Sequence, residues 1–139
     1  MIVLDTNVIS EFMGPAPAPQ VVRWANRQPN ASIWTTTITV YEIRMGLLAM
    51  PAGKRKTALF EQFQRWLTDV IESRVLSFDV AAAEQASELA AARRKAGRAG
   101  EHRDTMIAGI VAANRATLAT RNTRHFAELK SHVVNPWQE

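Results

Sequence analysis

The chain alternates short apolar runs with longer segments that have the features of helices. Runs suited to short strands cover residues 1–4, 33–36, 75–78, 117–120 and 132–134. Helical segments are expected at about 20–27, 40–50, 59–71, 81–95 and 103–114, and the one from Leu59 to Ile71 repeats apolar residues at three- and four-residue spacings. Strands that alternate with helices predict an α/β fold, a mostly parallel sheet of short strands covered by helices on both faces.

The length of 139 residues predicts one domain over residues 1–139, because neither an internal repeat nor a long linker divides the chain. The absence of cysteine excludes disulfides, thiolate zinc sites and a cysteine nucleophile. No basic leader follows Met1, and the longest apolar stretch, residues 106–113, is far shorter than the roughly 20 residues of a spanning helix. We therefore expect a cytoplasmic protein that does not enter a membrane.

The net charge of +4 and the pI near 10.1 favour a polyanionic partner. The basic residues form clusters, which are Lys54-Arg55-Lys56, Arg93-Arg94-Lys95 with Arg98 and Arg103, and the pair Arg121 and Arg124. The clusters could follow a nucleic-acid backbone, or they could be the solvated ends of helices. The sequence leaves both interpretations open.

Three acidic residues lie at or near the positions where α/β folds usually bind their ligands. Asp5 directly follows the first strand, Glu42 is expected in the first turn of the helix after the second strand, and Asp104 heads the helix before the fourth strand. Ligands of parallel sheets bind beyond the carboxyl ends of the strands. The three carboxylates are therefore candidates for one shared site.

Each acid also has a plain structural explanation. Asp5 could cap the next helix, Thr39-x-x-Glu42 fits a capping box, and Asp104 could favour the positive end of a helix dipole. Helical spacing argues against these explanations, since it places both later acids on apolar faces, Glu42 with Met45, Gly46 and Ala49, and Asp104 with Ile107, Ala108 and Val111. Inward carboxylates are costly unless they are paired or bind a cation, and clustered acids on a hard divalent cation commonly serve phosphodiester hydrolysis.

Five sequence blocks in order resemble the PIN-domain ribonuclease toxins of the VapC type. They are residues 2–11 with Asp5-Thr6-Asn7, residues 39–46 with Glu42, Asp104-x-x-Ile107-Ala108, Ala119-Thr120-Arg121-Asn122-Thr123, and residues 134–137. The last block is similar to the FitB-like branch of that group. The blocks extend from one end of the chain nearly to the other, so the resemblance covers all of it.

The resemblance implies a PIN-domain three-layer α/β/α sandwich and an endoribonuclease that depends on Mg²⁺, with Mn²⁺ as a substitute. It implies the toxin of a type II toxin–antitoxin module, a homodimer that cleaves RNA. A small DNA-binding antitoxin of the VapB or FitA kind, encoded alongside, would neutralise it, and operator DNA would be bound only through that antitoxin. Carried over residue by residue, the catalytic and metal-binding acids are Asp5, Glu42 and Asp104, and their polar surround is Thr6, Asn7, Thr120, Arg121 and Asn122.

The sequence departs from the family pattern at one point. Many relatives have a fourth acid after the fourth strand, at the position of Asn122 or three residues later, where this chain has His125. An asparagine offers a carbonyl oxygen but no charge, so the choice between one metal ion and two stays open.

Two other functions remain to be separated from this one. An aspartate after the first strand also opens phosphatases of the haloacid-dehalogenase type, but these need a second aspartate where this chain has Asn7. The missing fourth acid also leaves room for a degenerate PIN module that binds antitoxin or nucleic acid without cutting.

Overall fold

A five-stranded parallel sheet forms the centre of the computed structural model, which describes residues 1–139 except for the side chains of Lys130 and Ser131. Its strands are β1 (Ile2–Leu4), β2 (Ile33–Thr36), β3 (Val75–Leu76), β4 (Thr117–Ala119) and β5 (Val133–Val134). They lie in the order β3-β2-β1-β4-β5, and every pairing between neighbours is parallel. The prediction of a parallel sheet of short strands is confirmed.

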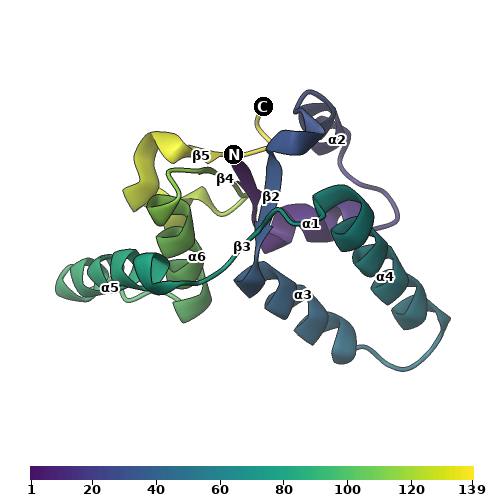
Figure 1. The fold of residues 1–139 in the computed structure, drawn as a ribbon, viewed down its shortest axis with the longest axis horizontal. Helices are drawn as coiled ribbons and strands as arrows, with labels where there is room; N and C mark the ends of the chain where they lie inside the picture. Colours follow the sequence, from purple (N-terminus) through teal and green to yellow (C-terminus); the bar gives the residue numbers. More distant parts are fainter.

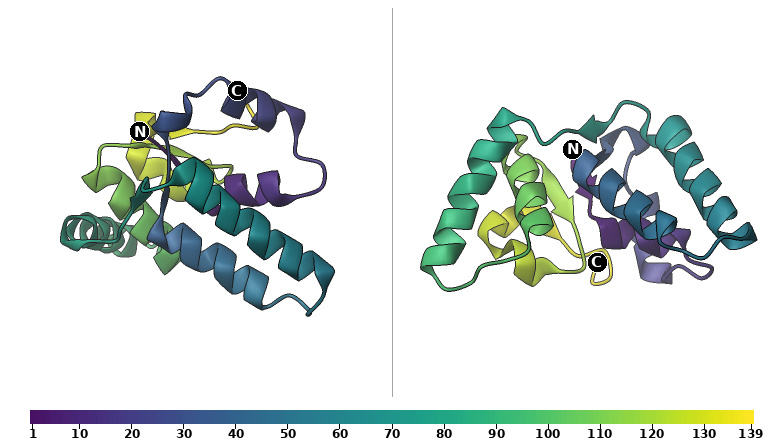
Figure 2. Two further views of the ribbon diagram at one scale, coloured as in Figure 1. Left: turned by 45° about the vertical axis from the view of Figure 1, so that its right-hand side comes forward. Right: turned by 90° about the horizontal axis from the view of Figure 1, so that it is seen from below.

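Helices cover both faces of this sheet (Figures 1 and 2). One face carries α1 (Thr6–Met13), α2 (Pro19–Asn26), α3 (Thr37–Leu48), α4 (Lys54–Arg65) and the π-helical turn η2 (Trp66–Ile71). The other carries α5 (Val80–Lys95), α6 (His102–Ala113) and the 3₁₀ segment η3 (Thr123–His132), and a short 3₁₀ turn, η1 (Asn30–Ser32), precedes β2. The expected three-layer sandwich is thus present. None of the helices in the described part of the chain has the length and apolar character needed to cross a membrane.

The two faces of the sheet have separate apolar cores. Successive strand residues point to opposite faces, so Val3 and Leu118 pack with the α6 and η3 side, whereas Leu4 and Ala119 pack with the α1–α4 side. All four of these residues are buried. This explains why the strands read as continuous apolar runs rather than as alternating ones.

The start of α3 differs from the prediction and changes the position of Glu42. Thr36 caps the helix, because its Oγ1 accepts a hydrogen bond from the backbone N–H of Thr39 at 3.0 Å. The helix therefore begins at Thr37 rather than near residue 40, and Glu42 lies in its second turn. The alternative of a Thr39–Glu42 capping box is therefore excluded, and Glu42 has no capping role.

Helices α5 and α6 approach each other closely at Gly109. A Cβ atom built at this position would lie 2.5 Å from the carbonyl oxygen of Ala82 and 2.7 Å from the Cβ of Ala86. Both neighbours belong to α5, and the first is a backbone atom that cannot rotate away. Only glycine fits α6 at this contact in the observed packing.

Thr35 contributes a buried hydroxyl to the core. The side chain of Thr35 in β2 is fully buried, and its hydroxyl makes no hydrogen bond within the part of the chain that the structure describes. Valine has nearly the same shape without the hydroxyl, and a buried polar group that lacks a partner costs about 1–3 kcal/mol. We expect Thr35→Val to raise the free energy of unfolding by about 1 kcal/mol in urea denaturation, whereas equal or lower stability would mean that the hydroxyl is satisfied in solution.

Candidate active site

The candidate site lies at the carboxyl ends of β1, the central strand, and of its neighbour β4. Asp5 directly follows β1 and Thr120 directly follows β4, and the backbone N–H of Asp5 donates to the carbonyl oxygen of Ala119 at 2.9 Å. The chain goes from β1 to β2 on one side, whereas β4 lies on the other side of β1. Parallel sheets bind ligands at such a switch point, so the topology places these residues at a ligand-binding edge.

Asp5 is buried and held by three hydrogen bonds. Its side chain is only slightly exposed, at 4% for the residue. One oxygen accepts from the backbone N–H of Thr6 at 2.8 Å, and the other accepts from the Thr120 hydroxyl at 2.7 Å and from Asn7 Nδ2 at 3.2 Å. Asp5 does cap α1, as the plain explanation expected, but capping uses only one of its oxygens.

Burial raises the pKa of Asp5 above its ordinary value, although the hydrogen bonds from Thr120, Thr6 and Asn7 lower the pKa in part. The negative charge of Asp104 raises the pKa further. An aspartate in these surroundings has an electrostatic reason to bind a cation.

The predicted polar residues form one connected network around Asp5. Asn7 uses its Nδ2 for Asp5 and Thr120, and its Oδ1 accepts from the backbone N–H of Arg121 at 3.1 Å. The backbone N–H of Asn122 donates to the Thr120 hydroxyl at 3.1 Å. The Arg121 guanidinium stacks on the ring of Trp137, 5.0 Å from its centre, so the C-terminal tail lies against this network. The side chain of Asn122 is exposed, and its role as a ligand stays a prediction.

Glu42 approaches the site from α3. The Thr6 hydroxyl donates to its Oε1 at 3.0 Å, and Arg103 Nη1 lies 3.7 Å from its Oε2. Burial raises the pKa of Glu42, Thr6 and Arg103 lower it, and the charges of Asp5 and Asp104 raise it again. Glu42 is therefore in electrostatic contact with the other two acids.

The prediction that Glu42 lies on an apolar, inward face of its helix is wrong. Met45 and Gly46, which share its face, are exposed, and the buried face of α3 is formed by Ile43 and Leu47. Glu42 is half-buried because it lies against α1 and the start of α6. This contact between elements distant in sequence cannot be derived from helical spacing.

Asp104 lies in the first turn of α6 and continues its buried face, as predicted. Ile107, Ala108 and Val111 on that face are buried. Because α6 leads into β4, it runs against the strands and begins at their carboxyl edge, which brings Asp104 to the site. Its Oδ2 lies 2.9 Å from Nδ1 of His125, a residue of η3.

Three residues of this region have roles that the sequence did not reveal. His125 contacts Asp104, and Arg103 pairs with Glu42. Arg93, for which the sequence left open a contact with a nucleic-acid backbone or a solvated helix end, is instead buried and paired with Glu128, so neither interpretation holds for this residue. His125 could have been suspected because it stands at a position where relatives have an acid; the partners of Arg93 and Arg103 lie too far along the chain to be inferred.

The donor set suits a hard divalent cation. The carboxylates of Asp5, Glu42 and Asp104 influence one another through their charges, and carboxylate oxygens are the ligands that Mg²⁺ prefers. Among the described residues, no three acidic or histidine side chains already lie close enough to hold one ion. A cation at this edge therefore competes with Arg103 and His125 for the oxygens of Glu42 and Asp104.

Comparisons with known proteins identify the family of the chain. Residues 2–131 match the PIN domain family. The chain is similar to the plasmid stability protein StbB of Pseudomonas syringae pv. tomato, with 43% identity over 99% of both chains, and to the VapC ribonuclease Y4jK of Sinorhizobium fredii, with 37% identity over 99% of both chains.

The toxin FitB of Neisseria gonorrhoeae is 32% identical over the full length of both chains. The crystal structure of FitAcB from that organism matches with a TM-score of 0.92 over 100% of both chains. A structure of FitAB bound to an IR36 DNA fragment matches with 33% identity and a TM-score of 0.91 over 99% of this chain and 96% of that one. The chain therefore belongs to the PIN-domain family and, within it, to the branch of the VapC and FitB toxins.

Proposed function

We propose that the protein is a metal-dependent endoribonuclease that acts as the toxin of a type II toxin–antitoxin module. The observation that carries the proposal is the buried Asp5 at the switch point of the sheet, which is connected to Glu42 through Thr6 and lies close enough to Asp104 for that charge to raise the pKa of Asp5. A polyanionic substrate also agrees with the net charge of +4. The VapC ribonuclease relative supports RNA as that substrate.

In this proposal Asp5, Asp104 and Glu42 hold Mg²⁺, with Mn²⁺ as a possible substitute. The bound ion would supply Lewis-acid stabilisation of the phosphodiester transition state and a more acidic water. Other residues of the chain hold the carboxylates in position. Thr120, Asn7 and the Thr6 N–H fix the carboxylate of Asp5, and the Thr6 hydroxyl orients Glu42.

The partners in this proposal are RNA, an antitoxin and a second copy of the chain. A small DNA-binding antitoxin of the VapB or FitA kind would neutralise the protein, and operator DNA would be bound only through it. The FitAB complex with DNA supports this part of the proposal. The toxin would act as a homodimer in the cytoplasm, where its RNA substrate lies.

The test is an RNA cleavage assay with purified protein. We expect cleavage of structured RNA in Mg²⁺ or Mn²⁺, loss of cleavage in excess EDTA, and no hydrolysis of p-nitrophenyl phosphate. Binding of RNA without cleavage in either metal would instead support a degenerate binding module. Hydrolysis of the phosphomonoester would support the phosphatase alternative, which the amide of Asn7 argues against because it already donates to Asp5 and Thr120.

A fourth carboxylate is expected to strengthen metal binding. The backbone of Asn122 already donates to the Thr120 hydroxyl that holds Asp5, so Asn122→Asp adds a negative charge at the edge of the site. An added charge at this range strengthens the attraction for a divalent cation by about threefold to tenfold in affinity. Calorimetric titration with Mn²⁺ measures this, and recruitment of a second ion would appear as a change in stoichiometry.

The matched control is Asn30→Asp, which makes the same change of net charge in the turn before β2, at the opposite end of the strands. We expect this variant to bind Mn²⁺ as the parent does. Equal affinity and stoichiometry in Asn122→Asp and the parent would place residue 122 outside the metal site and leave three acids as the whole of it.

A further inference from the structure

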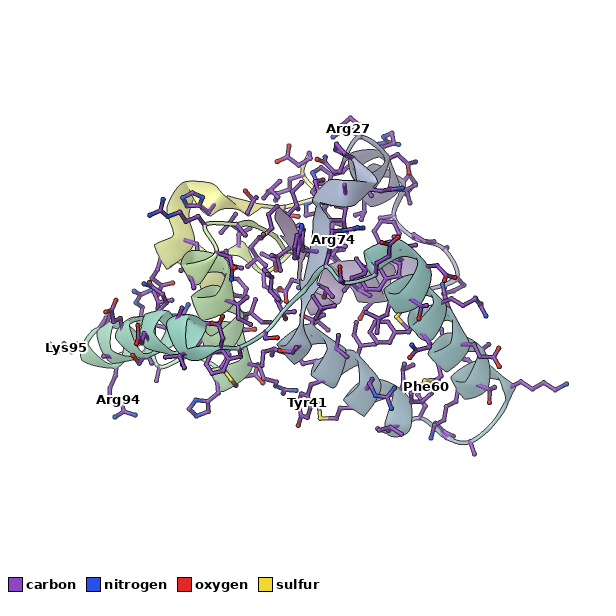
Figure 3. All side chains as sticks on the ribbon, viewed as in Figure 1. Arg27, Tyr41, Phe60, Arg74, Arg94 and Lys95 are labelled. Atoms are coloured by element: carbon purple, nitrogen blue, oxygen red, sulfur yellow. The ribbon has the colours of Figure 1, made fainter. Side chains whose placement is uncertain are left out.

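Arg93 is the buried member of an otherwise exposed basic run. It lies near the end of α5 and is only 5% exposed, whereas Arg94 and Lys95 are exposed (Figure 3). Packing encloses its head group closely, since a Cβ atom added at Gly100 would lie 3.2 Å from its Nη1. A buried guanidinium is costly unless all of its donors are used, so its partners indicate what it does.

The Arg93 guanidinium connects three segments of the chain. Its Nε and Nη2 donate to the two carboxylate oxygens of Glu128 at 2.9 and 3.0 Å, which is a two-pronged ion pair. Its Nη1 donates to the Thr105 hydroxyl at 2.9 Å, and Nη2 also donates to the backbone carbonyl of His125 at 2.6 Å. One rigid planar group thus joins the end of α5, the first turn of α6 and the segment η3.

The contacts of Arg93 with Thr105 and with the His125 carbonyl lie next to the candidate site. Thr105 follows Asp104 in the chain, and its hydroxyl also donates to the Glu101 carbonyl at 3.2 Å, so the first turn of α6 is fixed at this point. His125, whose backbone carbonyl Arg93 holds, places its Nδ1 2.9 Å from Asp104 Oδ2. Arg93 therefore holds the residue next to Asp104 on one side of this contact and the backbone of His125 on the other.

Stability alone does not account for this arrangement. Replacing a buried ion pair by well-packed apolar residues is often neutral or stabilising, because the desolvation of both charges is then avoided. An apolar pair, however, has no preferred direction, whereas the guanidinium fixes its partners through several directed hydrogen bonds. The network therefore differs from an apolar pair in that it fixes the orientation of the groups that Arg93 binds.

We propose that Arg93 is a positioning residue that sets the Asp104–His125 pair of the active site through its hydrogen bonds to Thr105 and to the His125 carbonyl. The inference rests on the proposed function, in which Asp104 binds the metal ion. Among the described residues no hydrogen bond joins Arg93 to Asp104, although both line one pocket. Arg93 acts on the pair through the Thr105 hydroxyl in α6 and the backbone carbonyl of His125 in η3. Outer-shell groups of this kind typically contribute 10–100-fold to metal affinity or activity.

The double variant Arg93→Leu/Glu128→Leu distinguishes an effect of Arg93 on the position of Asp104 and His125 from an effect on the stability of the protein. This variant removes both charges of the buried pair together, so we expect its melting temperature to stay close to that of the parent. We expect its kcat for RNA cleavage to fall by about tenfold or more and its Mn²⁺ affinity in calorimetry to fall by a similar factor, with a KM for RNA that changes little. The neighbouring exposed residue provides the control, Arg94→Leu, which should leave the melting temperature, the kcat and the Mn²⁺ affinity unchanged, whatever its effect on the KM for RNA.

Arg93→Lys is the second variant and does not depend on the double variant folding. It retains the positive charge, but one ammonium group cannot reproduce the planar fork that reaches Glu128, Thr105 and the His125 carbonyl together. We expect the same loss of kcat and of Mn²⁺ affinity in folded protein. Parental kcat and parental Mn²⁺ affinity in either folded variant would overturn the proposal.

A crystal structure of Arg93→Lys gives a readout that needs neither metal nor RNA. We expect the contact between His125 Nδ1 and Asp104 Oδ2 to be broken, and an unchanged contact would overturn the proposal. If the parent binds Mn²⁺ but cleaves no RNA, the proposed nuclease function fails, while the Mn²⁺ affinities and the crystal structure still decide the role of Arg93.

Discussion

Asp104→Asn is expected to lower the rate of RNA cleavage by more than about a hundredfold and to leave a folded protein. Removal of a direct metal ligand should exceed the 10–100-fold effect that is typical of an outer-shell group. Asp104 is half-buried at the start of α6, and its described contact is with His125, so an amide of the same shape leaves the core intact. Single-turnover cleavage in Mg²⁺, together with the melting temperature, measures both parts of this prediction.

Asp69→Asn is the matched control, because Asp69 is an exposed carboxylate on η2, away from the strand ends of the site. It should cleave RNA at the parental rate. If Asp104→Asn retained a rate near that of the parent, Asp104 would not be a metal ligand and the site assignment would fail.

Asp5→Asn should also abolish cleavage, but its effect on the stability of the fold is a balance of two opposing changes. The amide loses the charge that burial disfavours, which stabilises the metal-free protein. The amide also has one acceptor oxygen fewer than the carboxylate. Because all three groups around the Asp5 oxygens donate hydrogen bonds, the new NH₂ group would face another donor, either the Thr6 N–H or the Asn7 amide. Because these effects oppose each other, Asp104→Asn is the better inactive variant.

The pKa values of Asp5 and Glu42 have a defined consequence for stability. Both values are raised in the folded protein, chiefly by burial, so the folded state binds these protons more tightly than the unfolded state does. The resulting stabilisation is present below the pKa values of the unfolded chain and is lost as pH rises through those of the folded protein. A cation that binds the ionised acids offsets this loss at neutral pH.

Gly109→Ala is expected to destabilise the protein by about 3 kcal/mol, the upper part of the usual range for overpacking. The added Cβ would lie 2.5 Å from the Ala82 carbonyl oxygen and 2.9 Å from the backbone nitrogen of Ala86, so α5 and α6 must separate. The gain in helix propensity from glycine to alanine, about 1 kcal/mol, is too small to offset this cost. For a chain of this length the melting temperature should fall by about 10 °C.

Gly46→Ala is the control for the helix propensity itself. Gly46 is also inside a helix, α3, but a Cβ added there has no described heavy atom within 4 Å. We expect this variant to be more stable than the parent by up to about 1 kcal/mol. A Gly109→Ala protein that melts at the parental temperature would contradict the close packing of α5 against α6.

The order of the strands and helices could be predicted from the sequence because short buried strands and amphipathic helices have different apolar periods. Asp5 could be placed at the site for the same reason, since it directly follows a buried strand and its position depends on local order alone. Asp104 could be placed because its spacing to Ile107 and Val111 agrees with the buried face of α6.

The surroundings of Glu42 and Arg93 could not be predicted, because they depend on contacts between segments that are distant in the sequence. Glu42 was selected with an incorrect argument about its helix face, and its position follows from Thr6 and Arg103, which lie on other helices. Arg93 looked like one more surface charge because its partner, Glu128, is 35 residues away. Local periodicity describes single elements, and it contains no information on which buried charges meet between them.

The two separate cores on either face of the sheet have a consequence for how activity is lost. Glu42 belongs to the layer of α1–α4, Asp104 belongs to the layer of α5 and α6, and Asp5 lies at the sheet between them. The two layers also touch next to the site, because Ile38 of α3 packs against the core on the α5 and α6 side and Arg103 of α6 pairs with Glu42. The proposed cleavage therefore requires both layers to be aligned, and we expect a displacement of one layer by about 1 Å to lower the rate about a hundredfold while the far-UV circular dichroism spectrum remains native.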